Sequence, residues 1–303
     1  MIKRVSTNLP ASVHQRLLNR AQQTNRPFNE LLQYHVMERF LYRLSKSSHA
    51  GKFILKGALM FTAWKLAAYR PTMDIDLLGR TDNSLEALVA IAKEVCLQQV
   101  EPDGLVFYPG TVQATRIAED ANYQGVRIRL QATLGTAKVT QQLDIGFGDI
   151  VVPAPKAIEF PTLLAFPAPQ VRGYSKESIV AEKFESLATL GMLNSRMKDY
   201  FDIWTLSRQF DFDGETLSSA ITKTFSNRGT ALVPEAVGLT SRFAEDPTKK
   251  AQWRGFVRKS RLDVSADLSE IVLVLRSFLD PVTLALVAGR KFTGKWATSG
   301  HWF

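Results

Sequence analysis

The sequence feature that most constrains the fold is a pair of aspartates, one residue apart, inside an apolar run. Asp74 and Asp76 flank Ile75, and Leu77 and Leu78 follow directly. An alternation of this kind is typical of a β-strand, in which residues i and i+2 point to the same face of the sheet. The pattern predicts a half-buried strand that directs two carboxylates to one point. Because like charges repel and resist desolvation, a bound cation would relieve both costs.

A turn of small residues precedes this strand. The turn Lys56-Gly57-Ala58 ends a short apolar segment, and fifteen residues separate it from Asp74. A glycine lets the backbone approach a phosphate closely, and the start of a following helix offers unpaired N–H groups. Two carboxylates suit Mg²⁺, which proteins bind through one or two carboxylates plus substrate phosphates. The layout predicts a Mg²⁺ and triphosphate site, and the alternative is a chance Asp-X-Asp in a solvated turn.

A third carboxylate occurs later, in a second apolar strand pattern. Asp144 lies between Leu143 and Ile145. A metal site needs such a group from a neighbouring strand, either to complete the metal shell or to activate an attacking hydroxyl. The alternative is an ordinary aspartate on an edge strand.

A lysine on a predicted helix is the next candidate. Lys183 follows Ile179 by one helical turn, which places it close to the buried stripe of the helix. A lysine there can reach a triphosphate as a point charge. Its alternative role is a salt bridge with Asp199 or Asp202 of the next helix. The two roles are compatible, because a partner carboxylate can orient a phosphate-binding lysine.

Positive charge is concentrated at the start of the chain. Residues 1–80 contain 13 Lys and Arg against 4 Asp and Glu, a balance of +9 that equals the balance of all 303 residues. A basic surface near a metal site favours polyanionic substrates such as nucleotides or RNA. The alternative is a solvated basic helix face. A second basic stretch, residues 249–261, could form part of an RNA-binding surface, although Trp253 and Phe256 within it are typical of a helix core.

Composition excludes several classes of protein. Hydrophobic content of 45% and charged content of 22% are typical of a globular protein. No apolar stretch is long enough for a transmembrane helix, and residues 1–6 lack the apolar core of a signal peptide. The single Cys96 excludes an intrachain disulfide and fits a reducing compartment, so we expect a cytoplasmic protein with no membrane partner.

Periodicity predicts an α+β fold. Apolar residues recur at helical spacing in the N-terminal part, strand patterns dominate the middle, and the pattern from Ser175 nearly to Val287 is helical. We expect the aromatic tail, residues 291–303, to pack back on the body. Expected helices are Pro10–Ala21, Phe28–Leu44, Leu59–Ala68 and Ser84–Gln98, and expected strands are Phe53–Leu55, Met73–Leu78, Val126–Ala132 and Lys138–Phe147, the last two joined across Gly135-Thr136. The expected organisation is an N-terminal helical segment at 1–50, a core at 51–152, a Pro-rich crossover at 153–174 and a helical domain at 175–303.

Together these motifs resemble the AbiEii/MenT family of bacterial nucleotidyltransferase toxins, within the DNA polymerase β-like nucleotidyltransferase superfamily. The superfamily pattern is Gly-Gly or Gly-Ser, a helix, Asp-X-Asp/Glu, and a third Asp on a later strand. Ala58 departs from it, which removes a hydroxyl but keeps the backbone N–H. The matching residues, in order and spacing, are Gly57-Ala58, Asp74-Ile75-Asp76, Asp144, Ala181-Glu182-Lys183 and Lys198-Asp199-Tyr200-Phe201-Asp202.

The resemblance implies an architecture and a set of site residues. N-terminal helices would precede a mixed or antiparallel nucleotidyltransferase sheet flanked by helices, and a C-terminal helical bundle would follow. Asp74, Asp76 and Asp144 would bind Mg²⁺, and Asp144 would also help to deprotonate the acceptor hydroxyl. Lys183, oriented by Asp199 or Asp202, would bind the triphosphate of the NTP. The other residues expected to contact the nucleotide are Lys56, Gly57, Ala58 and Arg70.

The resemblance also implies a substrate and a regulator. Relatives add nucleotides to the 3′ end of tRNA, which blocks aminoacylation and translation and causes growth arrest or abortive phage infection. They pair with a separately encoded antitoxin, often a winged-helix protein. In some relatives a residue at the place of Thr72 is phosphorylated to silence the toxin. The alternatives are the same chemistry on a protein or a small molecule, and a non-catalytic binding module on the same scaffold.

Overall fold

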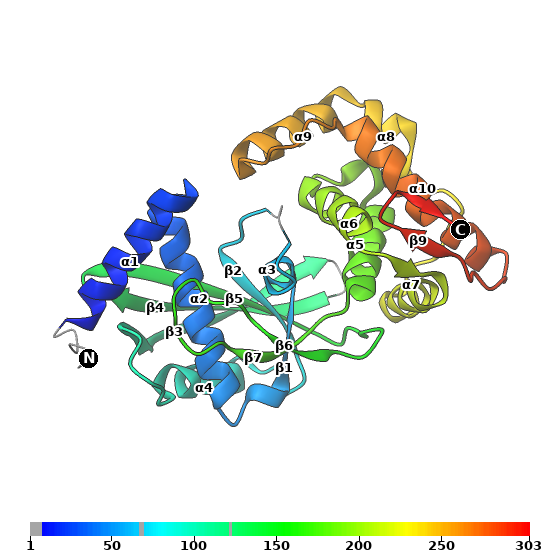
Figure 1. Cartoon of the computed structure of the whole chain (residues 1–303). Helices are drawn as coiled ribbons and strands as arrows, with labels where there is room; N and C mark the ends of the chain where they lie inside the picture. Colours follow the sequence, from blue (N-terminus) through cyan, green and yellow to red (C-terminus); the bar gives the residue numbers. More distant parts are fainter. Residues whose placement is uncertain (1–7, 67–69, 121–122) are drawn as a thin grey trace. The chain divides into compact units, whose positions relative to one another are not determined.

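The computed structural model describes residues 8–66, 70–120 and 123–303 (Figure 1). The predicted features of residues 1–6 and the last two residues of the predicted Leu59–Ala68 helix therefore lie outside the described residues, and the described part of that helix ends at Ala63, earlier than predicted. The chain forms two compact units. The first comprises Met1–Lys65, Pro71–Gly148 and Ala157–Gly173, and the second comprises Leu66–Arg70, Asp149–Lys156 and Tyr174–Phe303. The expected α+β fold class is confirmed.

The first unit combines helices with a mixed sheet. Its helices are α1 (Leu9–Thr24), α2 (Phe28–Lys46), α3 (Leu59–Ala63) and α4 (Leu85–Leu97). Its strands are β1 (Phe53–Lys56), β2 (Asp74–Gly79), β3 (Leu105–Asp120), β4 (Tyr123–Leu134), β5 (Ala137–Phe147), β6 (Lys156–Glu159) and β7 (Gln170–Gly173). Among the described residues these strands form one sheet in the order β3-β4-β5-β2-β1-β7-β6.

The centre of the sheet is built around β2. This strand pairs in parallel with β5 and antiparallel with β1, while β3, β4 and β5 form an antiparallel meander. The β4–β5 hairpin turns across Gly135-Thr136, as the sequence predicts, with Leu134 opposite Ala137. Gly135 adopts a φ of +59°, a conformation that glycine accepts without steric cost.

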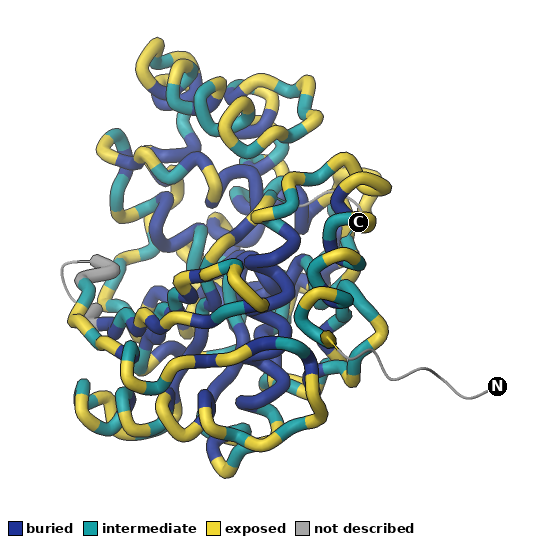
Figure 2. The backbone as a smooth tube through the Cα atoms, turned by 90° about the vertical axis from the view of Figure 1, so that its left-hand side faces the viewer, coloured by how far each residue is buried: buried dark blue, intermediate teal, exposed yellow. Residues whose placement is uncertain are grey.

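One face of the sheet forms the hydrophobic core of the first unit. Ile75 and Leu77 of β2 are buried at 0% and 2% exposure. Leu77 lies with Phe40 of α2, Leu88 of α4 and Leu143 of β5 around one small internal space. Buried segments are dark blue in Figure 2. Because successive side chains of a strand alternate between faces, β2 directs its aspartates to the face opposite these apolar residues.

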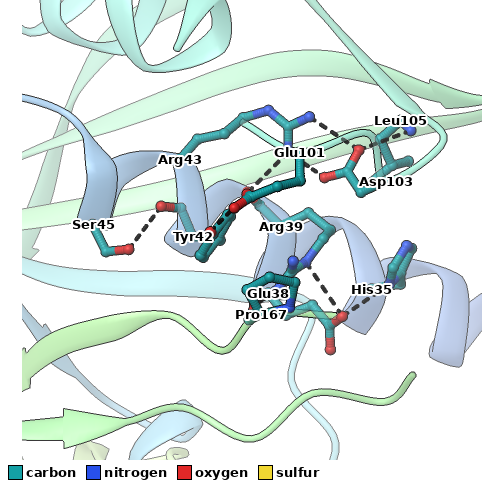
Figure 3. A network of polar contacts seen from close by, with 10 residues as sticks. All are labelled: His35, Glu38, Arg39, Tyr42, Arg43, Ser45, Glu101, Asp103, Leu105 and Pro167. Atoms are coloured by element: carbon teal, nitrogen blue, oxygen red, sulfur yellow. Dashed lines mark hydrogen bonds and ion pairs between the residues drawn. The ribbon is translucent and has the colours of Figure 1, made fainter. Parts of the chain in front are cut away.

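Helix α2 is buried on all sides. Every residue from Leu31 to Leu44 is buried, and the helix packs against α1, α4, β5 and β7. Its charged side chains have partners inside the unit (Figure 3). Arg43 donates to both carboxylate oxygens of Asp103, at 2.6 and 3.0 Å. Arg39 donates to the carbonyl of Pro167 at 2.6 Å, so α2 also fixes the Pro-rich segment.

The second unit is mainly helical. Its helices are α5 (Lys176–Leu190), α6 (Met197–Gln209), α7 (Gly214–Arg228), α8 (Ser241–Glu245), α9 (Pro247–Ser260) and α10 (Leu268–Val287). Several of them begin at a side chain that accepts a hydrogen bond from the first turn, which satisfies a backbone N–H that the helix leaves unpaired. These capping residues are Ser175, Asp213, Asp246 and Asp267. No described helix has both the length and the apolar content to span a membrane.

The C-terminal tail packs onto the second unit, as expected. Strands β8 (Phe212–Asp213), β9 (Lys295–Ala297) and β10 (His301–Trp302) form a small sheet in the order β10-β9-β8. Trp296 is 1% exposed, and its indole N–H donates to the carbonyl of Ser207 at 2.6 Å. The indole N–H of Trp302 donates to the carbonyl of Phe278 at 3.0 Å.

The sequence analysis missed the shortest strands. Strands β6 and β7 lie within the Pro-rich segment, and β8 interrupts a stretch read as helical. These strands have two to four residues. A run this short does not reveal an alternating pattern, and its pairing depends on partners that are distant in sequence.

Candidate active site

The two aspartates of β2 project from one face of the sheet. Asp74 and Asp76 are half-buried, and Ile75 between them is fully buried. Asp76 is in register with Asp144 of the parallel strand β5. Residues in register on neighbouring strands point to the same face, so the backbone directs all three carboxylates to one side of the sheet. The sequence analysis expected these three residues on neighbouring strands, and the structure places them there.

The turn after β1 is in direct contact with Asp76. Gly57 has a φ of +67°, and a Cβ built on it would lie 2.0 Å from Oδ2 of Asp76. The carboxylate therefore occupies the space that any other residue at position 57 would fill. Ala58 is buried at 1% exposure, and Lys56 is in register with Asp76 on the antiparallel strand.

Asp144 is held by an arginine that the sequence analysis did not identify. Arg127 of β4 donates to both carboxylate oxygens of Asp144, at 2.8 and 2.7 Å, and Gln142 donates to one of them at 3.3 Å. Arg127 stands opposite Asp144 in the β4–β5 hairpin. This pairing follows from the predicted turn at Gly135-Thr136, because counting back from the turn on both strands brings the two residues together.

The donor set of β2 fits a small divalent cation. No group of three or more His, Cys, Asp or Glu that could hold a metal ion occurs in the described part of the chain. Mg²⁺ does not require such a cage, because one or two carboxylates together with substrate phosphates and waters complete its shell. Asp74 and Asp76 supply that number of hard oxygen donors, and the contact with Gly57 fixes one of them.

The second unit contains a separate cluster of charges. The ammonium of Lys183 on α5 lies 2.5 Å from Asp199 and 2.8 Å from Asp202, both of α6. Asp202 also accepts two hydrogen bonds from Arg70, each of 3.0 Å, and Asp199 pairs with Arg196 at 2.9 Å. Both carboxylates are fully buried, so each needs the cations around it.

Lys183 and Asp199 stabilise the charged form of each other. Burial by itself would lower the pKa of Lys183, but Asp199 and Asp202 outweigh it, and the pKa is raised. Burial would raise the pKa of Asp199, but Lys183 and Arg196 outweigh it, and the pKa is lowered. Three cations, Arg70, Lys183 and Arg196, therefore contact the two carboxylates. Both Asp199 and Asp202 contact the lysine, so the salt bridge that was expected with one of them forms with both.

Thr72 lies just before β2. It is 9% exposed, and its backbone N–H donates to the hydroxyl of Tyr34 at 3.3 Å. The structure thus groups Gly57, Asp74, Asp76 and Asp144 in the first unit, and Arg70, Lys183, Asp199 and Asp202 in the second.

Comparisons with known proteins identify the family. The model of the family described as nucleotidyl transferase AbiEii toxin, type IV TA system, matches residues 39–274. The chain belongs to the AbiEii family of nucleotidyltransferase toxins. Membership makes it a nucleotidyltransferase of a type IV toxin–antitoxin system, with an NTP as substrate and an antitoxin as partner. No curated protein sequence matches the chain.

Two solved structures from Helicobacter pylori are similar to this chain. JHP933 is 15% identical, with 86% of this chain and 93% of that chain covered and a TM-score of 0.46. A second structure, described as a proposed nucleotidyltransferase, is 15% identical, with 87% of this chain and 99% of that chain covered and a TM-score of 0.48.

Proposed function

We propose that this toxin transfers a nucleoside monophosphate from an NTP to the 3′ end of tRNA. The terminal hydroxyl oxygen of the tRNA forms a bond to the α-phosphorus, the bond from the α-phosphorus to the β-phosphate breaks, and pyrophosphate leaves. A tRNA modified in this way cannot be aminoacylated, so translation stops and growth is arrested, or phage infection aborts. The observation that carries the proposal is the placement of Asp74, Asp76 and Asp144 on one face of neighbouring strands, with Gly57 packed against one of them.

In this proposal Asp74 and Asp76 bind Mg²⁺ through their carboxylate oxygens. When bound, the ion neutralises charge on the triphosphate. Ile75 and Leu77 are buried in the core and fix the backbone of the strand. The two aspartates therefore extend from a rigid backbone. The turn Lys56-Gly57-Ala58 provides backbone N–H groups for a phosphate in this proposal.

Asp144 accepts the proton of the acceptor hydroxyl in this proposal, or adds a ligand to the metal. A carboxylate has about four lone-pair sites, and the two hydrogen bonds from Arg127 and the one from Gln142 leave one for this purpose. The paired hydrogen bonds from Arg127 set the plane of the carboxylate. Arg127 is therefore a positioning residue for Asp144.

The cluster around Lys183 binds the triphosphate in this proposal. A lysine ammonium has three N–H donors, and Asp199 and Asp202 take two of them. The third donor suits a phosphate oxygen. Arg70, which pairs with Asp202, is expected to contribute to the binding of the triphosphate.

Other proposals concern the acceptor and the control of the enzyme. The charge of +9 supports RNA as the acceptor, rather than a small molecule or a protein. A winged-helix protein is the proposed form of the antitoxin, and phosphorylation of Thr72 is a proposed means of silencing. A phosphate on Thr72 would add negative charge two residues from Asp74 and compete with the triphosphate. Because Thr72 is buried, a kinase would need the segment before β2 to open.

The test is nucleotide transfer by purified protein with Mg²⁺, each labelled NTP in turn, and total tRNA. We expect label at the tRNA 3′ end and none with the Asp74→Asn variant, which keeps the shape of the side chain and removes its charge. Digestion of the labelled RNA from its 3′ end locates the added nucleotide. Label that appears only on a protein or a small molecule would exclude tRNA as the acceptor, and absence of transfer to any acceptor would support a binding module.

A further inference from the structure

Helix α9 of the second unit carries basic residues and no acidic ones. Residues 247–262 contain six Lys and Arg and no Asp or Glu. Two of the six act within the unit. Lys249 is 6% exposed and donates to the carbonyl of Asn194 at 2.8 Å, and Lys250 pairs with Glu245.

The other four cations are directed to solvent. All four are exposed, and none of their side chains has a hydrogen bond or ion pair in the described part of the chain. They are Arg254, Arg258, Lys259 and Arg261, and together they are called the α9 basic surface. Arg254 and Arg258 are one turn apart, so they lie on one face of the helix. The opposite side is fixed by Trp253, which is 3% exposed and donates to the carbonyl of Ala266 at 3.1 Å.

Two of the basic residues near the start of the chain differ from those of α9. Two of the cations that give residues 1–80 their charge, Arg39 and Arg43, are buried and bound to groups of the first unit. They are not available to a ligand. The positive charge of α9 is instead on the surface and unpaired, which is the state that a polyanion needs.

The surface of α9 suits a nucleic-acid backbone better than a protein partner. No large apolar side chain is exposed among the described residues 241–265, whereas a protein interface has an apolar or aromatic centre. Cations in the last turn also stabilise the helix dipole, but this effect fades beyond one turn and does not explain Arg254. We propose that the α9 basic surface binds phosphates of the RNA acceptor, an inference that rests on the proposed function in taking RNA as the substrate.

The experiment compares two variants that each lose three charges from the second unit. Arg254→Gln/Arg258→Gln/Lys259→Gln alters α9. The control, Lys223→Gln/Arg290→Gln/Lys291→Gln, removes three exposed cations whose side chains also have no hydrogen bond or ion pair among the described residues. These residues line a pocket beside α7 and the end of α10. Binding of fluorescent deacylated tRNA is measured without NTP at a series of salt concentrations, and thermal unfolding confirms that both variants fold.

We expect the α9 variant to bind tRNA about tenfold or more weakly at low salt, and the slope of log K against log salt to fall by about 2, because each lost phosphate contact removes roughly 0.7–0.9 from it. The control should stay close to the wild-type protein. Equal slopes and affinities for the two variants would overturn the inference. So would normal tRNA binding by the α9 variant combined with loss of binding to the antitoxin.

The same data separate this inference from the proposed function. If the α9 variant loses tRNA binding but no NTP labels the tRNA with the wild-type protein, the α9 surface is supported and the proposed transfer reaction is wrong. If the wild-type protein labels the tRNA and both variants bind it equally, the reaction stands and the α9 surface is excluded. A wild-type protein that binds no tRNA at any salt concentration overturns both.

Discussion

At the scale of single residues, the active-site face depends on two contacts that are specific to their side chains. Asp76 packs against the backbone of Gly57, and Asp144 accepts two hydrogen bonds from Arg127. In each contact the aspartate and its partner come from different segments of the chain. Each contact therefore offers a substitution that changes the site without removing a carboxylate.

The first such substitution is Gly57→Ala. The new Cβ would lie 2.0 Å from Oδ2 of Asp76, so the carboxylate must move, and we expect loss of at least nine-tenths of nucleotide transfer. The matched control is Gly229→Ala, which has a φ of +66° and no atom within 4 Å of the added carbon. Both variants carry the same backbone strain, of order 1 kcal/mol, and only the first has the clash. Equal activity in the two variants would show that the contact with Asp76 does not matter.

The second substitution is Arg127→Gln. Loss of the paired hydrogen bonds frees the Asp144 carboxylate to rotate, and we expect transfer to fall roughly 10–100-fold, as when an outer partner of a ligand is removed. Arg129→Gln is the control, because Arg129 is two residues along the same strand, and its side chain donates to Gln142, at 3.3 Å, and to no other side chain among the described residues. The measurement is the rate of transfer at saturating NTP. A similar small effect in both variants would contradict the positioning role.

At the scale of elements, helix α2 is the structural surprise of the first unit. A helix buried on all sides is normally apolar, but α2 carries Glu38, Arg39 and Arg43 at 6% exposure or less. Each charge has a partner supplied by another part of the unit, including the backbone N–H of Leu163, which donates to Glu38 at 2.8 Å. The network therefore ties α2 to segments far from it in sequence.

This network predicts the effect of Asp103→Asn. The neutral side chain would leave the Arg43 guanidinium buried without a counter-charge, and we expect the free energy of unfolding to fall by about 3 kcal/mol or more. Tyr42→Phe is the control. It removes one hydrogen bond to the exposed Glu101, which is worth roughly 1 kcal/mol. Urea unfolding measures the free energy of unfolding of both variants. If Asp103→Asn lowers it by no more than Tyr42→Phe does, Arg43 has found another partner or water.

Sequence patterns predicted the elements whose apolar residues alternate or recur over many positions. They did not predict features that depend on residues distant in the sequence. The alternation at Asp74–Leu78 gave both the strand and the face of the carboxylates, and the turn at Gly135-Thr136 gave the hairpin. The burial of α2 could not be predicted, because its charged residues resemble those of a solvated helix until their partners are placed. The contact between Arg127 and Asp144 is not visible in the motifs themselves. It follows only when residues are counted back from the turn on both strands.

At the scale of the whole molecule, the predicted site residues belong to two compact units with different kinds of stabilisation. In the first unit, the apolar core under the sheet supports the carboxylates. In the second, Lys183 and its partners form a buried ionic cluster, whose stability depends on the charge of every member. The two units should therefore respond differently to pH.

The expected response to acid follows from Asp199. Its pKa in the folded protein is lowered from the ordinary value of 3.8, so its ion pairs stabilise the second unit fully above about pH 4 and are lost as the pH falls below it. The raised pKa of Lys183 has the opposite sign, and its contribution is lost only above its ordinary value of 10.5. We expect melting temperature to fall between pH 5 and 3 in the wild-type protein, and less steeply in Asp199→Asn. If the melting temperatures of the two proteins fall equally steeply with pH, Asp199 is not the group that causes the loss of stability in acid.

The close approach of Gly57 to Asp76 has a consequence for genetics. Every missense change of a single base in a glycine codon encodes a residue with a Cβ, so each of them places a carbon against the Asp76 carboxylate. No conservative replacement exists at this codon. Cells that escape the toxin by spontaneous mutation should therefore carry codon 57 changes of many chemical kinds, whereas Gly51, around which an added carbon meets nothing within 4 Å, should rarely be among them.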